Sequence, residues 1–176
     1  MVSNMEKCLL TTILRVLFGV VWVLDGLLET QAGVTPQVLS LLYQLNANGQ
    51  PSWLTPWFNF WTPIVIHNAA LMLGMLFLSE IILGVALVLG VARKLVYYFG
   101  VPYSLILWGL SGFGGPYTPY SSDLGAPVMY AFVFLALIAL ELETGRAASR
   151  FLSFDAIIER HLSKWKKLAE FSQSQA

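Results

Sequence analysis

The chain has 176 residues, of which 57% are hydrophobic and 11% are charged, and its ten basic residues balance ten acidic ones. Since an average soluble domain carries about a quarter charged residues, the composition excludes an ordinary soluble enzyme and offers no basic surface for nucleic acid. The single cysteine, Cys8, excludes an internal disulfide, and two histidines give little from which to build a site, so we expect no haem or metal within the chain.

Four apolar segments are long enough to cross a membrane, since a helix needs roughly 20 apolar residues to span the hydrocarbon core. They cover residues 9–28, 64–90, 95–112 and 126–144. The first is interpreted as a retained span and not a secretory signal, because Arg15 interrupts it and no small-residue cleavage site follows. The sequence therefore predicts an all-α fold, with a four-helix transmembrane bundle over residues 1–145 and a cytoplasmic tail over 146–176.

The basic residues predict an orientation for this bundle. Four spans place all ten on one side of the membrane, and the loops on the other side, 29–63 and 113–125, contain none. By the positive-inside rule, both termini and the turn at 91–94 are cytoplasmic, in a prokaryotic inner membrane. The ten are Lys7, Arg15, Arg93, Lys94, Arg146, Arg150, Arg160, Lys164, Lys166 and Lys167.

The first outer loop contains two structured segments. TPQVLSLLYQLNANG predicts a short helix that begins with Thr35 as its N-cap and ends at Asn48-Gly49. The following PSWLTPWFNFWTP repeats tryptophan every fourth residue, at 53, 57 and 61. A helix here would carry one stripe of indole rings, which suits an aromatic belt at the membrane interface, or alternatively a lid or partner surface.

Ionisable residues inside the spans are candidates for a functional site, because they are costly in hydrocarbon. Arg15 and Asp25 share one small, polar face of the first span with Gly19 and Gly26, and this face must point into the bundle. Glu80 lies in the second span at a depth similar to that of Arg15. We therefore expect Arg15 and Glu80 to form a structural ion pair, with a direct role at a ligand as the alternative.

The second outer loop, GFGGPYTPYSSDLGAP at 112–127, is stiff and rich in aromatic residues. Its glycines and prolines allow unusual backbone angles, and Asp123 either caps the last span or faces the space below the loop. We expect an ordered loop that closes over an outer pocket bounded by Asp25, His67 and Trp108.

A quinone head group, with two carbonyl acceptors and an apolar tail, suits such a pocket. His67 would be the catalytic proton-handling group, with Asp25 or Asp123 orienting it. The residues expected to bind the quinone are Trp22, Trp108, Tyr117 and Tyr120.

The tail from residue 149 onward places apolar residues at helical spacing and basic residues on other faces. We expect an amphipathic helix on the anionic inner leaflet, with docking of a cytoplasmic protein as the alternative. The predicted apolar residues are Phe151, Phe154, Ile158, Leu162, Trp165 and Ala169.

Two strings in the spans resemble the DoxX superfamily of four-helix membrane proteins. They are Arg15-x-x-x-Gly19-x-x-Trp22-x-x-x-Gly26 and Glu80-x-x-x-Gly84-x-x-Leu87-x-x-Gly90-x-x-Arg93. The loop GFGGPYTPYSSDLG resembles the DoxD branch, the small membrane subunit of thiosulfate:quinone oxidoreductase. This resemblance covers roughly residues 9 to 144. It implies oxidation of thiosulfate to tetrathionate, with electrons passed to membrane quinone, beside a second subunit called DoxA.

The sequence therefore leaves two alternative functions. The first is a DoxD-like subunit of a quinone-linked oxidoreductase. The second is a non-catalytic helical subunit that assembles or stabilises a larger respiratory or photosynthetic complex. Both imply contact with membrane lipid and with other protein subunits, and neither implies nucleic acid.

Overall fold

The computed structural model describes residues 4–31, 33–47, 51–113, 124–144 and 152–171, and every element in these ranges is helical. The all-α prediction is therefore confirmed for the described part of the chain. The elements are α1 (Asn4–Glu29), α2 (Val34–Ala47), α3 (Thr55–His67), α4 (Ala69–Leu89), α5 (Arg93–Leu110), α6 (Ala126–Thr144), α8 (Asp155–His161), the 3-10 turn η2 (Ser163–Trp165) and α9 (Lys166–Ala169).

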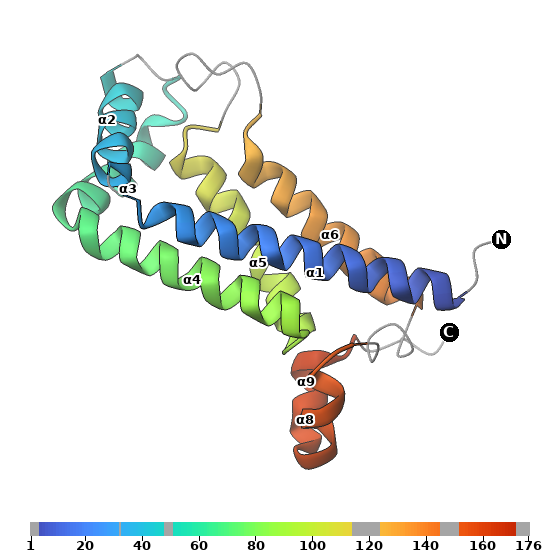
Figure 1. The fold of residues 1–176 in the computed structure, drawn as a ribbon. Coiled ribbons are helices and arrows are strands. Elements are labelled where there is room, and N and C mark those ends of the chain that lie inside the picture. The colour runs from blue at the N-terminus through green and yellow to red at the C-terminus, as the bar shows by residue number, and fades with distance from the viewer. Residues whose placement is uncertain (1–3, 32, 48–50, 114–123, 145–151, 172–176) are drawn as a thin grey trace.

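Three of the helices, α1, α4 and α6, are long and apolar enough to span a membrane. They run lengthwise with the shorter α5, as Figure 1 shows, while α2 and α3 lie at one end of this bundle. We call that end the cap end. At the opposite end, which we call the tail end, α8 and α9 lie beside the end of α4. Residues 152–171 contact the bundle at this end, through hydrogen bonds to the Leu89 and Gly90 carbonyl oxygens.

Glycines allow the long helices to pack closely. A β-carbon added to Gly19 would lie 2.8 Å from the carbonyl oxygen of Gly84, and one added to Gly84 would lie 2.7 Å from the carbonyl oxygen of Gly19. The backbones of α1 and α4 therefore touch, as small residues allow in membrane helices. On the other side of the bundle, a β-carbon at Gly100 of α5 would lie 2.3 Å from the ring of Phe134 on α6.

The centre of the bundle is an apolar core with several aromatic rings. Phe18 and Phe134 pack edge to face with their ring centres 4.9 Å apart, a favourable arrangement for two aromatic rings. None of the core side chains is more than 6% exposed. The core consists of Phe18, Trp22, Leu83, Leu87, Tyr97, Phe134 and Leu137.

The predicted helix over 64–90 is wrong at its start. Asn68 has φ −136° and ψ 48°, so the backbone leaves the helical region there and separates α3 from α4. The break lets α3 fold against α2, where Leu45, Leu54 and Phe58 form a second small core. The predicted short helix in the first loop corresponds to α2.

The predicted stripe of three tryptophans is only partly formed. The Trp57 and Trp61 rings lie 5.8 Å apart, and Trp57 Nε1 donates a hydrogen bond to the Gly109 carbonyl oxygen at 3.1 Å. Trp53 lies before α3 begins and is 64% exposed. Trp57 therefore attaches the cap to α5, while Trp53 lies on the surface.

The predicted amphipathic tail helix is divided into the short elements α8, η2 and α9. The segment is broken by η2, and Phe154 and Leu162 are 49% and 57% exposed, whereas Asp155 is fully buried. The reason is that the Asp155 carboxylate binds backbone and side-chain donors of the bundle, which turns the neighbouring apolar side chains outward.

Candidate functional site

Three carboxylates meet where α1 packs on α4, and we call Asp25, Glu29 and Glu80 the acidic cluster. Glu80 is only 5% exposed and interacts electrostatically with the other two. Gly26 makes this approach possible, since a β-carbon there would lie 3.3 Å from Cβ of Glu80. Within the described ranges, none of the three forms an ion pair with a basic side chain, and they are not arranged to hold a metal ion.

Aromatic residues surround the cluster on its inner side. The Tyr130 hydroxyl on α6 donates a hydrogen bond to Asp25 Oδ2 at 2.6 Å. The Trp22 ring, one turn along α1, lies between Tyr103 and Tyr130, with ring centres 5.7 and 5.2 Å away. The Tyr103 hydroxyl in turn shares a hydrogen bond with Ser79 Oγ. These contacts fix Asp25 in position, whereas no hydrogen bond from a tyrosine of the described ranges reaches Glu29 or Glu80.

Besides Arg15 Nη1 at the tail end, four buried polar atoms of α1, α4 and α5 have no hydrogen-bond partner in the described part of the chain. Two are acceptors, Oε2 of Glu29 and Oε2 of Glu80. The other two belong to fully buried residues, Nε1 of Trp22 and Oγ of Ser104. Leaving such a group unsatisfied costs about 1–3 kcal/mol, so native proteins keep few of them, often at places with a chemical role.

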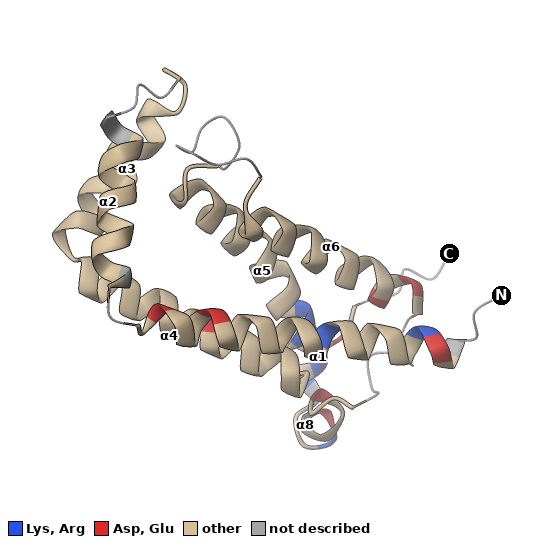
Figure 2. Cartoon of the chain, turned by 45° about the horizontal axis from the view of Figure 1, so that its top comes forward, with Lys and Arg blue, Asp and Glu red and all other residues tan. Residues whose placement is uncertain are grey.

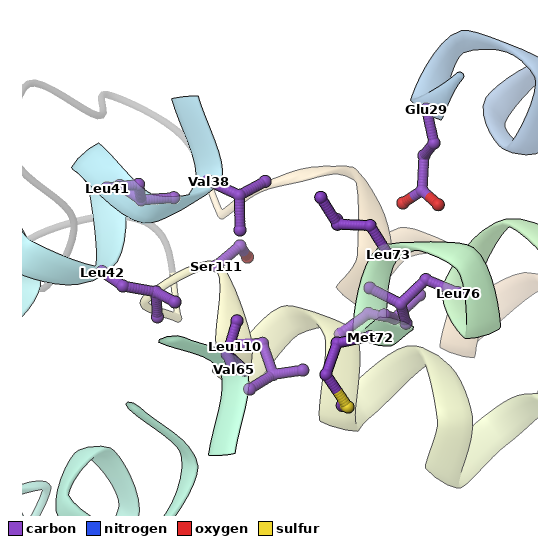
Figure 3. A pocket seen from close by; sticks show the side chains of 11 residues that line it. Glu29, Val38, Leu41, Leu42, Val65, Met72, Leu73, Leu76, Leu110 and Ser111 are labelled. Atoms are coloured by element: carbon purple, nitrogen blue, oxygen red, sulfur yellow. The ribbon is translucent and has the colours of Figure 1, made fainter. Parts of the chain in front are cut away.

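A cavity of about 150 Å³ lies beside the acidic cluster at the cap end. Its walls come from α2, α3, α4 and α5 and are apolar, with Met72, Leu73 and Leu76 on the α4 side. Figure 3 shows the Glu29 carboxylate directed from α1 toward Leu73 and Leu76. An apolar cavity of about this size in another protein binds benzene, so this one accommodates a small ring or part of an apolar chain.

The predicted ion pair between Arg15 and Glu80 is wrong. Arg15 lies beside Gly90, where a β-carbon would come within 1.6 Å of Nη1, and its Nη2 donates to the Leu152 carbonyl oxygen at 2.7 Å. Glu80 precedes Gly90 by ten residues on the same helix, which corresponds to about 15 Å. The prediction assumed that the first two spans end at the same level, whereas α1 begins at Asn4 and extends beyond α4.

Of the other predicted site residues, Asp25 and Trp22 lie at the acidic cluster. His67 is exposed at the end of α3, and the cavity is lined by neither His67, Asp25 nor Trp108. Trp108 Nε1 instead donates to the Leu124 carbonyl oxygen at 2.6 Å. The structure therefore does not bring His67 and Asp25 together around this cavity. The remaining predicted residues, Tyr117, Tyr120 and Asp123, lie outside the described residues.

A second buried cluster at the tail end holds charges of both signs, and we call Arg93, Tyr97, Glu141 and Asp155 the tail-end network. Arg93 Nη1 lies 3.1 Å from Glu141 Oε1, and Arg93 Nε lies 3.0 Å from Asp155 Oδ2. The Tyr97 hydroxyl donates to Glu141 Oε1 at 3.4 Å. Every charge here has a partner, so this network is structural. The apolar core separates it from the acidic cluster.

Sequence reasoning missed this network because it assigned Arg93 to a cytoplasmic turn. One signal was present, since Glu141 is an ionisable residue inside the last predicted span.

Comparison of the chain with protein-family models, curated proteins and solved structures finds no match. The function is therefore argued from the site itself.

Proposed function

We propose that the protein is an integral membrane subunit of a quinone-linked oxidoreductase, with the acidic cluster and its cavity as the quinone site. In this proposal α5 is the fourth span and both termini are cytoplasmic. The absence of basic residues from 29–63 and 113–125 supports this orientation. Figure 2 agrees, because the charges of the described ranges gather toward the tail end, apart from acidic stretches where α1 lies over α4.

The observation that carries the proposal is the buried Glu80 carboxylate, which has an unpaired oxygen and no basic neighbour bonded to it in the described part of the chain. A charge in hydrocarbon is expensive, and carboxylates inside spans commonly mark proton relays or ligand sites. The apolar cavity beside Glu29 suits the rest of such a ligand. The resemblance of the first two spans to the DoxX superfamily supports the same assignment.

The residues fit the chemistry of a quinone, which supplies a two-electron couple that takes up or releases two protons. Glu29 and Glu80 provide oxygens that accept hydrogen bonds from hydroxyl groups and exchange protons with them. Of the cluster, Glu29 lines the cavity itself, together with Ser111. Tyr130 holds Asp25 by its hydrogen bond, so Asp25 orients the cluster. The proposal therefore assigns proton exchange to Glu29 and Glu80, and not to His67.

In this proposal the electron donor binds to another subunit. Thiosulfate carries two negative charges, and the loops 29–63 and 113–125 contain no lysine or arginine with which to attract it. We therefore assign binding of the donor, thiosulfate in the DoxD-like case, to a partner subunit such as DoxA. The electrons would then pass from the donor on the partner subunit to a quinone bound by this chain, whose carboxylates exchange the accompanying protons.

Binding of a short-chain ubiquinol, kept reduced, to the purified full-length protein in lipid nanodiscs tests the proposal. We expect Glu80→Gln to weaken binding about tenfold, because a quinol hydroxyl donates to the carboxylate and hydrogen bonds to a charged group contribute roughly 1.5–3 kcal/mol. The control is Glu143→Gln, which removes a carboxylate that forms a surface ion pair with Lys7 on another face. Equal affinity in the wild type and both variants, or no binding by the wild type, would overturn the quinone site.

The alternative function, assembly of a larger membrane complex, is favoured by the exposed aromatic residues at the cap end. Tyr43, Trp53 and Phe60 are 58%, 64% and 61% exposed. Aromatic side chains of this kind are enriched at protein interfaces and at membrane interfaces. An assembly subunit would not bind quinone alone but would co-purify with a larger complex, so the nanodisc experiment also separates the two functions.

A further inference from the structure

We propose that residues 152–171 carry a binding site for the head group of an anionic phospholipid, in the hollow between α8 and α9. The ligand class is a phosphodiester with hydroxyl groups, as in phosphatidylglycerol. This inference does not depend on the quinone site, which lies at the other end of the bundle.

The first step is that this segment is fixed at the end of a membrane span. Phe154 N donates to the Leu89 carbonyl oxygen at 3.0 Å, and Asp155 N donates to the Gly90 carbonyl oxygen at 3.2 Å. Ser153 Oγ also donates to the Gly90 carbonyl oxygen, at 2.6 Å. Because Leu89 is the last residue of α4, the segment begins where that span leaves the hydrocarbon. It therefore lies at the depth of the lipid head groups.

The exposed face of the segment has the composition of an interfacial surface. Its large apolar side chains are turned outward, with Leu152 70% exposed, Ile157 53% and Leu162 57%. Basic residues accompany them in the same segment, and Lys164 and Lys167 are both exposed. Apolar and basic side chains together favour the surface of an anionic leaflet.

Within this surface, a hollow of about 270 Å³ is lined by Ala156, Glu159, Arg160 and Lys166. Two cations and one carboxylate give a formal charge of +1, which matches the single negative charge of a phosphodiester. Arg160 and Lys166 suit the phosphate oxygens. The Glu159 carboxylate suits the hydroxyl groups of a glycerol head group. The neighbouring apolar side chains explain why a lipid is expected here and not a free phosphodiester.

Native mass spectrometry of the full-length protein in detergent, titrated with phosphatidylglycerol, tests this site. The test variant is Arg160→Gln with Lys166→Gln. The control is Lys164→Gln with Lys167→Gln, which makes the same change of charge in the same segment outside the hollow. We expect the test variant to bind roughly 30-fold more weakly, since a direct ion pair with the phosphate contributes up to about 1 kcal/mol and two are lost, while the control removes no such pair and changes much less.

Two further ligands test which head group the site prefers and whether binding needs the acyl chains. Phosphatidylethanolamine should bind more weakly than phosphatidylglycerol, and glycerophosphoglycerol, the head group without acyl chains, should not compete. Equal losses in the two double variants would indicate attraction by net charge alone and overturn the site. Competition by glycerophosphoglycerol at equal concentration would overturn the lipid assignment. Unchanged binding in the test variant would overturn both.

Discussion

At the scale of single residues, two glycines on α4 differ in what surrounds them. Gly84 touches the backbone of Gly19, whereas a β-carbon at Gly74 would meet nothing within 4 Å beyond its chain neighbours and its own helix backbone. Gly84→Ala must push α1 and α4 apart, and such overpacking costs about 1–3 kcal/mol. Gly74→Ala should be neutral or slightly stabilising, because alanine favours the helix. Thermal unfolding of both variants in the same detergent measures the difference, and equal melting temperatures would contradict the close contact of α1 with α4.

At the scale of secondary-structure elements, the start of α5 depends on a residue far along the chain. Asp155 Oδ1 accepts a hydrogen bond from Ala92 N at 2.7 Å, and Oδ2 accepts one from Arg93 N at 3.3 Å. A carboxylate at this position caps free amide groups and favours the positive end of the helix. Trp165 Nε1 donates to Asp155 Oδ1 at 2.7 Å and completes the arrangement. Asp155 thus does for α5 what an ordinary N-cap residue does for its own helix.

Removal of this cap should destabilise the protein strongly. We expect Asp155→Ala to lower the free energy of unfolding by about 3–5 kcal/mol, because Arg93 is then buried beside a single carboxylate, Glu141. Glu143→Ala, which breaks the surface ion pair with Lys7, should cost less than about 1 kcal/mol. Denaturant titration in detergent compares the two. A similar small loss in both would mean that Asp155 contributes little to the stability of α5.

At the scale of the whole molecule, the orientation is open to a direct test by cysteine labelling. In a Cys8→Ser background, Gln44→Cys on α2 and Lys167→Cys on α9 are both exposed positions at opposite ends of the bundle. A thiol reagent that does not cross membranes should label position 44 in intact spheroplasts, and position 167 only after lysis. The reverse pattern would place the termini outside and contradict the positive-inside assignment.

The sequence was enough to predict an all-helical chain with long apolar helices, and it singled out two residues of the site proposed here. Asp25 and Glu80 were identified because ionisable residues are costly in a span. A charged residue inside an apolar segment can be recognised from its neighbours in the sequence alone. The predicted pairing of Arg15 with Glu80 was wrong because the contact of Gly19 with Gly84 sets the register of α1 on α4. Counting residues from the end of each span does not reveal this contact. Asp155 looked like any acidic residue in a polar tail. Its role depends on a fold that brings it to Ala92, 63 residues earlier.

This distance along the chain has a consequence for biosynthesis. Translation proceeds from the N-terminus, so α5 leaves the ribosome seconds before Asp155 exists, at the usual rates of elongation. During that interval the amide groups at Ala92 and Arg93 lack the carboxylate that later binds them. Membrane insertion of the spans is therefore separable from the final closure of the bundle, which waits until Asp155 has left the ribosome. A nascent chain that stops before residue 155 would lack the carboxylate that binds these two amide groups and would remain open at its tail end.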